Sequence, residues 1–191
     1  MHPELLAVLA RLDRAFEGLR IPYVVGGSVA STLHGEARMT QDIDVLVDIA
    51  PWQVAAVIGA LTGFMIDPVA TSAAVGAGDA FQAIDAATGW KIDLFPVHDE
   101  AADRAQLARR IRVELDAAHA DAAWFASPED IVLRKLDWFR RSGGVLERQL
   151  RDVIGVLKVQ RGRLDEAYLT EHARRRDLVD LLARARREAG S

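Results

Sequence analysis

The chain has 191 residues, of which 50% are hydrophobic and 27% are charged, as in an ordinary soluble globular protein. This length favours one domain, or one domain with a helical appendage. The absence of cysteine excludes disulfides, thiolate metal sites and a cysteine nucleophile. No segment approaches the roughly 20 apolar residues of a membrane span, and the N-terminus lacks the basic start of a secretory signal. We therefore expect a cytoplasmic protein that makes no use of a membrane.

Charge is unevenly distributed along the chain. Residues 1–126 hold 9 Lys and Arg against 17 Asp and Glu, whereas residues 127–191 hold 15 against 11. The net charge of −4 argues against a strongly basic nucleic-acid binder. The basic back half is either a set of solvated helix faces or a surface that attracts phosphates.

The first half of the chain alternates helix and strand patterns. Residues 3–19 place apolar side chains on one helical face, and residues 21–25 read as a short buried strand. Residues 28–33 predict a short helix, residues 43–47 a second strand, and residues 51–61 a helix that begins near a proline.

The next stretch predicts a β-hairpin. Residues 81–85 and 90–95 read as two strands around a turn that contains Gly89. Residues 110–115 form a weaker strand pattern, and the small Gly- and Ala-rich residues 71–78 predict a loop.

From Ser127 the pattern becomes helical. Ser127, Pro128 and an acidic first turn are a strong helix start. Helices follow over about 128–141, 146–160, 165–173 and 177–188. We therefore predict an α+β protein, with a mixed α/β core over residues 1–126 and a C-terminal helical subdomain over residues 127–191 that packs on it.

Several residues of the first half suggest phosphate chemistry. Gly26, Gly27 and Ser28 lie between a strand and a helix, where backbone amides and the helix dipole favour a phosphate. Asp42 and Asp44, two residues apart on a strand, point to the same side. Two such carboxylates suit Mg²⁺, and a third on an adjacent strand would complete a two-metal site for phosphoryl transfer.

Asp93 is the best candidate for the third acid, because it lies mid-strand between apolar residues. Asp85 is its rival, and we rank it lower because an Asp beside a turn is usually exposed. Lys91 points to the same side of its strand as Asp93, where an ion pair with Asp93 is favoured over a phosphate contact. An Asp-x-Asp pair alone is more often only a solvated strand face.

Together these runs resemble the DNA polymerase β-type nucleotidyltransferase superfamily. The resemblance lies in residues 24–28, 33–35 and 38–47, and within the superfamily it is nearest the minimal, toxin–antitoxin-linked branch of AbiEii-like and MenT-like proteins. Residues 127–136 and 149–153 also resemble that branch. The resemblance implies the nucleotidyltransferase fold, a mixed sheet flanked by helices with a helical bundle after it.

The resemblance also implies residue roles. Gly26, Gly27 and Ser28 match the nucleotide-phosphate turn, while Asp42, Asp44 and Asp93 match the ligands of two Mg²⁺ ions. Asp93 would also serve as the base for the incoming hydroxyl. Four further residues match family positions that contact phosphate, neutralise its charge, or orient the residues that do so. They are Arg38, Thr40, Lys135 and Asp152.

A role in ordinary helix ion pairs is the alternative for two of these. Lys135 lies on a helix rich in charged residues, and Asp152 has Arg148 four residues before it. Sequence alone leaves both readings open.

The functional expectation is a Mg²⁺-dependent nucleotidyltransferase that moves an NMP from an NTP to a hydroxyl, acting as the toxin of a toxin–antitoxin pair. The acceptor would be RNA such as tRNA, or a protein, and an antitoxin protein would be a partner. One alternative is a catalytically silent binding protein that keeps the fold as an antitoxin partner. The other is an aminoglycoside-type enzyme with a small acceptor, which the acidic front half would suit.

Overall fold

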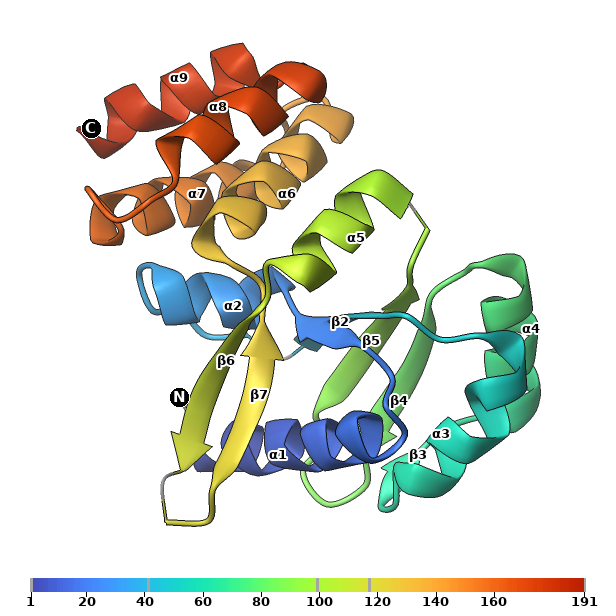
Figure 1. Cartoon of the computed structure of the whole chain (residues 1–191). Coiled ribbons are helices and arrows are strands. Elements are labelled where there is room, and N and C mark those ends of the chain that lie inside the picture. The colour runs from blue at the N-terminus through green and yellow to red at the C-terminus, as the bar shows by residue number, and fades with distance from the viewer. Residues whose placement is uncertain (1, 41, 99, 117, 191) are drawn as a thin grey trace. The chain divides into compact units, whose positions relative to one another are not determined.

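A mixed sheet of seven strands dominates the first part of the computed structural model, which describes residues 2–40, 42–98, 100–116 and 118–190 (Figure 1). Helices flank this sheet and make up the whole C-terminal part, so the predicted α+β class is confirmed. The chain groups into two compact units. The first unit comprises residues 1–26 and 40–126, and the second comprises residues 27–39 and 127–191.

The second unit includes a segment from the front half of the chain. The expected division lay between residues 126 and 127, whereas residues 27–39 associate with the C-terminal helices. The reason is the packing of α2 (Gly27–His34), which contacts α6 (Pro128–Arg141) and α7 (Glu147–Val159).

The strand order of the sheet is β3-β4-β5-β2-β1-β7-β6. The strands are β1 (Tyr23–Val25), β2 (Asp42–Val47), β3 (Phe64–Met65), β4 (Phe81–Asp85), β5 (Lys91–Pro96), β6 (Ile111–Asp116) and β7 (Asp121–Phe125). The pairs β2–β5 and β1–β7 are parallel, and the other neighbours are antiparallel. The predicted hairpin is the antiparallel pair β4–β5.

The two faces of the central strands differ in polarity because successive side chains on a strand alternate. On β2 and β5 the side chains of Ile43, Val45, Ile92 and Leu94 are fully buried. Asp44 on β2 and Asp93 on β5 lie between these apolar residues, and their side chains are only partly buried. One face of these strands therefore forms core, while the other carries the carboxylates.

Among the described residues, the first unit holds four helices and a 3-10 turn. They are α1 (Pro3–Gly18), η1 (Pro51–Gln53), α3 (Val54–Ala60), α4 (Pro68–Ala77) and α5 (Glu100–Ala108). Helix α1 contacts β7, α4 contacts β4, and α5 contacts β1. Figure 1 shows α3 and α4 together near the β3–β4 edge of the sheet.

The prediction of a loop over residues 71–78 was wrong, because α4 covers most of that stretch. Asp67 caps the helix by accepting hydrogen bonds from the amides of Val69 and Ala70, and Pro68 occupies the first position. Gly78 ends the helix in the left-handed conformation, with φ of 77°. The run of small residues is a helix whose N-terminal cap, Asp67, lies before the predicted window and whose C-terminal cap, Gly78, ends it.

Every regular element among the described residues of the second unit is a helix. Its helices are α2, α6, α7, α8 (Glu166–Arg175) and α9 (Val179–Ala189). Helix α7 packs against α6 and α9, with Leu150, Val153 and Val156 fully buried. The start of α6 follows the prediction, because the Ser127 hydroxyl accepts from the amide of Asp130 and Pro128 occupies the first position.

The end of α2 lies directly against α7. A Cβ on Gly35 would lie 2.8 Å from the backbone nitrogen of Val156, and one on Gly155 would lie 3.2 Å from the nitrogen of Glu36. Two glycines thus allow the segment after α2 to approach the α7 backbone. Among the described residues, no helix is both long and apolar enough to cross a membrane.

Candidate active site

Three carboxylates lie on one face of neighbouring parallel strands. Asp44 on β2 is the register partner of Asp93 on β5, and Asp42 is the partner of Lys91. Partners in register point to the same face, and residues two apart on a strand do so as well. The first unit therefore brings Asp42, Asp44 and Asp93 to one face, with Lys91 among them.

Like charges side by side on a sheet repel, and Lys91 offsets part of this repulsion. Its Nζ lies 3.0 Å from Asp93 Oδ2 and 3.5 Å from Asp42 Oδ1. The hydrogen bond with Asp93, together with the nearby Asp42 carboxylate, raises the pKa of Lys91. The expected ion pair between Lys91 and Asp93 is confirmed, and Asp42 shares it.

The donor set of this acidic face fits a hard divalent cation. Its ligands are carboxylate oxygens alone, the kind that Mg²⁺ prefers, and the Lys91 ammonium shows that a positive charge is stabilised there. In the described part of the chain, no three Asp, Glu or His side chains are already arranged to hold a metal. A bound cation would compete with the Lys91 ammonium for the oxygens of Asp42 and Asp93.

The rival acid, Asp85, lies on the opposite face of the sheet. It alternates with exposed Gln82 and Ile84 on β4, and its side chain is 0% exposed. Arg11 from α1 donates a hydrogen bond to Asp85 Oδ1 at 2.6 Å, and Thr88 contacts the other carboxylate oxygen. The prediction that Asp85 is exposed was wrong, because its carboxylate is buried and Arg11 of α1 supplies a partly exposed ion-pair partner.

The surroundings of Asp85 explain its ionisation. Burial alone would raise the pKa of Asp85, but hydrogen bonds from Thr88 and Arg11 outweigh burial and lower the pKa. Asp85 is thus a charged structural residue on the core face, and it is separated from the acidic face by the sheet itself.

Two residues beside the acidic pair shape its backbone. The Thr40 hydroxyl donates to the carbonyl oxygen of Asp42 at 3.2 Å, and the amide of Gly26 donates to the carbonyl oxygen of Asp44 at 2.8 Å. Gln41, between Thr40 and Asp42, lies outside the described residues. Thr40 and Gly26 therefore contact the backbone of β2.

The predicted phosphate turn opens α2 in the second unit. Gly27 has φ of 54°, a left-handed conformation that glycine adopts without strain, and α2 begins at this residue. The Ser28 hydroxyl accepts a hydrogen bond from the guanidinium of Arg38. The turn thus places backbone amides, a hydroxyl and a cation in one region of the second unit.

Arg38, Lys135 and Asp152 form a buried polar cluster. Arg38 Nε donates to Asp152 Oδ1 at 2.9 Å, and Lys135 Nζ donates to Asp152 Oδ2 at 2.7 Å. Lys135 also donates to Gln149 Oε1 at 3.0 Å, and its side chain is 5% exposed. The proposed surface role for Lys135 is therefore contradicted, because its partner lies 17 residues away on α7.

Asp152 is held as a carboxylate by two cations. Burial by itself would raise the pKa of Asp152, but hydrogen bonds from Arg38 and Lys135 outweigh burial and lower the pKa. The contacts of Asp152 involve α6 and the segment after α2, not Arg148 on its own helix. Asp152 therefore holds Lys135 and Arg38 together, and Arg38 in turn contacts Ser28.

Comparison with known proteins gives structural matches alone. No protein-family profile matches the sequence, and no curated protein matches it. An antigenic nucleotidyltransferase-like protein from Paracoccidioides brasiliensis matches with a TM-score of 0.58 at 17% identity, over 96% of this chain and 92% of that one. The solution structure of the antibiotic-resistance factor ANT(2'')-Ia matches with a TM-score of 0.55 at 13% identity, over 96% and 99% of the two chains.

A crystal structure of ANT(2'')-Ia in complex with adenylyl-2''-tobramycin gives a similar result, with a TM-score of 0.54 at 13% identity over 96% and 98% of the two chains. The chain has the nucleotidyltransferase fold. At these identities the likeness concerns the fold, and the nucleotidyltransferase fold expected from the sequence is confirmed.

The sequence identified most of these residues but not their burial or their contact partners. Gln149 was missed because an uncharged residue on a charged helix gives no signal of its contact with Lys135. The burial of Asp85 was missed because Arg11 lies 74 residues away in the chain. An arginine on the apolar helix of residues 3–19 was the one available hint.

Proposed function

We propose that the chain is a Mg²⁺-dependent nucleotidyltransferase, which moves a nucleoside monophosphate from an NTP to a hydroxyl and releases pyrophosphate. The observation that carries the proposal is the shared face of Asp42, Asp44 and Asp93 on adjacent parallel strands. The fold supports it, because three similar structures have the nucleotidyltransferase fold.

The first unit would supply the metal ligands. Asp42, Asp44 and Asp93 would hold two Mg²⁺ ions, which would neutralise charge on the phosphates as the transferred group moves. Asp93 would also accept the proton of the acceptor hydroxyl while the hydroxyl oxygen forms a bond to the α-phosphorus. The bond from that phosphorus to the bridging oxygen breaks, and pyrophosphate leaves.

The motif resemblance assigns the contacts to the triphosphate to the Ser28 turn and to two cationic residues. The amides at Gly27 and Ser28 would donate hydrogen bonds to phosphate oxygens. Lys135 would offset triphosphate charge, with Asp152 holding its ammonium in place. Arg38 would act from beside Ser28, where its guanidinium already contacts the serine hydroxyl.

Two acceptor classes deserve a direct test. RNA is the first, because the helical half of the chain has the excess of Lys and Arg that a polyanion would require. A small cationic acceptor is the second, because the two ANT(2'')-Ia structures resemble this chain across 96% of its length and one of them holds adenylyl-2''-tobramycin. A protein acceptor, a role as a toxin and a partner antitoxin stay predictions from the motif resemblance.

The test is transfer of an α-³²P-labelled nucleotide in the presence of Mg²⁺. Each of the four NTPs is incubated with the purified chain and with RNA, tobramycin or total protein as acceptor. Asp44→Asn should reduce transfer by at least about a hundredfold, as loss of an essential electrostatic group does. Asp79→Asn is the matched control and should retain transfer, because Asp79 is exposed and has no side-chain hydrogen bond or ion pair among the described residues. Absence of transfer from every NTP to every acceptor would contradict the proposal and favour a silent binding protein.

A further inference from the structure

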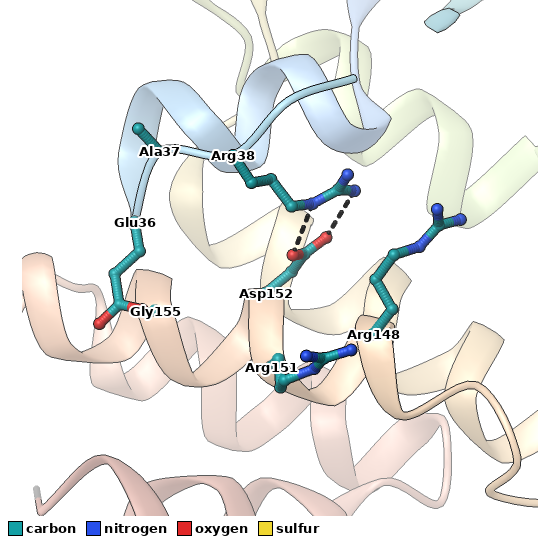
Figure 2. A pocket seen from close by; sticks show the side chains of 7 residues that line it. All are labelled: Glu36, Ala37, Arg38, Arg148, Arg151, Asp152 and Gly155. Carbon is teal, nitrogen blue, oxygen red and sulfur yellow. Dashed lines mark hydrogen bonds and ion pairs between the residues drawn. The ribbon is translucent and has the colours of Figure 1, made fainter. Parts of the chain in front are cut away.

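A cavity of about 250 Å³ lies within the second unit. Its lining residues are Glu36, Ala37, Arg38, Arg148, Arg151, Asp152 and Gly155 (Figure 2). Arg148 lies three and four residues before Arg151 and Asp152, and Gly155 lies four and three residues after them, so the four residues share one face of α7. The segment after α2 supplies the opposite wall, and Figure 2 shows Arg38 reaching from it to Asp152.

Glycine contacts fix the width of this cavity. Gly35 and Gly155 let the segment after α2 lie against the α7 backbone, with too little room for a Cβ at Gly35. Close backbone packing therefore places the segment that carries Arg38 against α7. A pocket with such preformed walls loses little conformational entropy when a ligand binds.

The carboxylates at the cavity already have cationic partners. Asp152 binds Arg38 and Lys135, and Glu36 lies 3.6 Å from Lys158 Nζ. Arg148 and Arg151, by contrast, have no ion pair or side-chain hydrogen bond in the described part of the chain. Two guanidinium groups therefore line the cavity without a carboxylate partner. Both side chains are exposed, so no ion pair imposes their position at the cavity.

The arginines of this wall favour a tetrahedral oxyanion such as phosphate. Guanidinium groups bind phosphate oxygens in a bidentate manner, and their affinity for phosphate is greater than that of an isolated ammonium. The volume is below the range of about 300–1,000 Å³ typical of pockets that hold a whole drug-sized ligand. The cavity is thus suited to one or two phosphate groups, with the rest of the ligand outside it.

We propose that Arg148 and Arg151, with Arg38 held by Asp152, form a phosphate-binding subsite of the second unit. The cavity and its charge stand on the structure alone, whereas the identity of the ligand rests on the proposed function. The phosphate group comes either from the triphosphate of the donor nucleotide or from the backbone of an RNA acceptor. Both sources present the same chemistry to the arginines, and binding measurements separate them.

The test compares two double variants of the full chain that lose the same charge. Arg148→Gln with Arg151→Gln empties the cavity of its unpaired cations. Arg163→Gln with Arg187→Gln removes two exposed arginines of the same unit that do not line the cavity. Circular dichroism establishes that both variants are folded.

Binding is measured with two probes, and neither depends on turnover. Calorimetry follows inorganic pyrophosphate, and fluorescence anisotropy follows a labelled RNA hairpin over a series of salt concentrations. We expect the cavity variant to lose at least about tenfold in affinity for one probe or both relative to the control variant, as loss of direct phosphate contacts predicts. Loss for pyrophosphate assigns the subsite to the donor, and loss confined to RNA assigns it to the acceptor.

Equal affinities of the two double variants for both probes would overturn the subsite. The failure of the proposed function looks different, because the chain would then transfer no nucleotide while the cavity variant still lost phosphate binding. Conversely, if the cavity variant transferred nucleotide normally and bound both probes as the control variant does, the proposed function would stand and the proposed subsite would be overturned.

Discussion

Asp44 on β2 and Asp93 on β5 are register partners in a parallel strand pair, so their carboxylates share one face of the sheet. Lys91 lies two residues before Asp93, and its ammonium contacts the carboxylates of both Asp93 and Asp42. The acidic face therefore carries its own counter-ion. A divalent cation and Lys91 would compete for the same oxygens.

Replacement of Lys91 by methionine should strengthen divalent metal binding. Without the ammonium, Asp42 and Asp93 repel one another, and a cation relieves that repulsion. Because the group is partly exposed, we expect a modest gain of about tenfold in affinity, equal to about 1.4 kcal/mol. Calorimetric titration of Mn²⁺ into the wild type and the variant measures it.

Lys158→Met is the matched control, since Lys158 pairs with Glu36 and lies outside the acidic face. Equal metal affinities in the wild type and in Lys91→Met would show that the ammonium does not occupy the place of the metal.

Addition of a methyl group at Gly35 should destabilise the second unit. The new Cβ would lie 2.8 Å from the backbone nitrogen of Val156, where neither partner is a flexible side chain. We expect Gly35→Ala to lower the free energy of unfolding by about 1–3 kcal/mol, the usual cost of overpacking. Urea denaturation measures this change.

Gly59→Ala is the contrasting change in α3, because a Cβ there would meet nothing within 4 Å. Removal of a helical glycine should raise stability by about 0.5–1 kcal/mol. A stable Gly35→Ala variant would mean that α7 and the segment after α2 are not held in contact.

The Asp152 cluster should contribute stability that depends on pH. Hydrogen bonds from Arg38 and Lys135 hold the folded pKa of Asp152 below that of the unfolded chain, which is about 3.9. Its contribution is therefore fully present above the unfolded pKa and is lost as the pH falls through the folded pKa. The stability difference between the wild type and Asp152→Asn should be largest above about pH 5 and shrink below it.

Urea denaturation of the two proteins between pH 3 and pH 7, about the range over which a carboxyl titrates, measures this difference. A difference that stays constant over that range would contradict the assigned ionisation of Asp152.

Strand alternation made much of the fold and part of the site predictable. On β2 the apolar Ile43, Val45 and Val47 occupy every second position, which identified the core face and left Asp42 and Asp44 for the other. Ser127 and Pro128 marked the start of α6 in the same direct way. These signals are local, because each of them lies within one short segment of the chain.

Long-range contacts were beyond reach of the same reasoning. Arg11 and Asp85 meet across 74 residues, and residues 27–39 join helices that begin 100 residues later. Residues 121–125 were not assigned as a strand because Asp121, Ala122 and Ala123 lack the β-branched side chains of a typical strand. Pairing with β6 and β1 makes them a strand all the same.

The most direct test of the account compares two acids of the same hairpin, Asp93 on the acidic face and Asp85 on the core face. Asp93→Asn should abolish nucleotide transfer, with a loss of at least about a hundredfold, and leave the unfolding free energy nearly unchanged. Asp85→Asn should do the reverse, lowering stability by about 3 kcal/mol as the ion pair with Arg11 is lost, while the folded fraction still transfers nucleotide. Transfer that survives Asp93→Asn but is lost in folded Asp85→Asn would contradict the assignment of the acidic face.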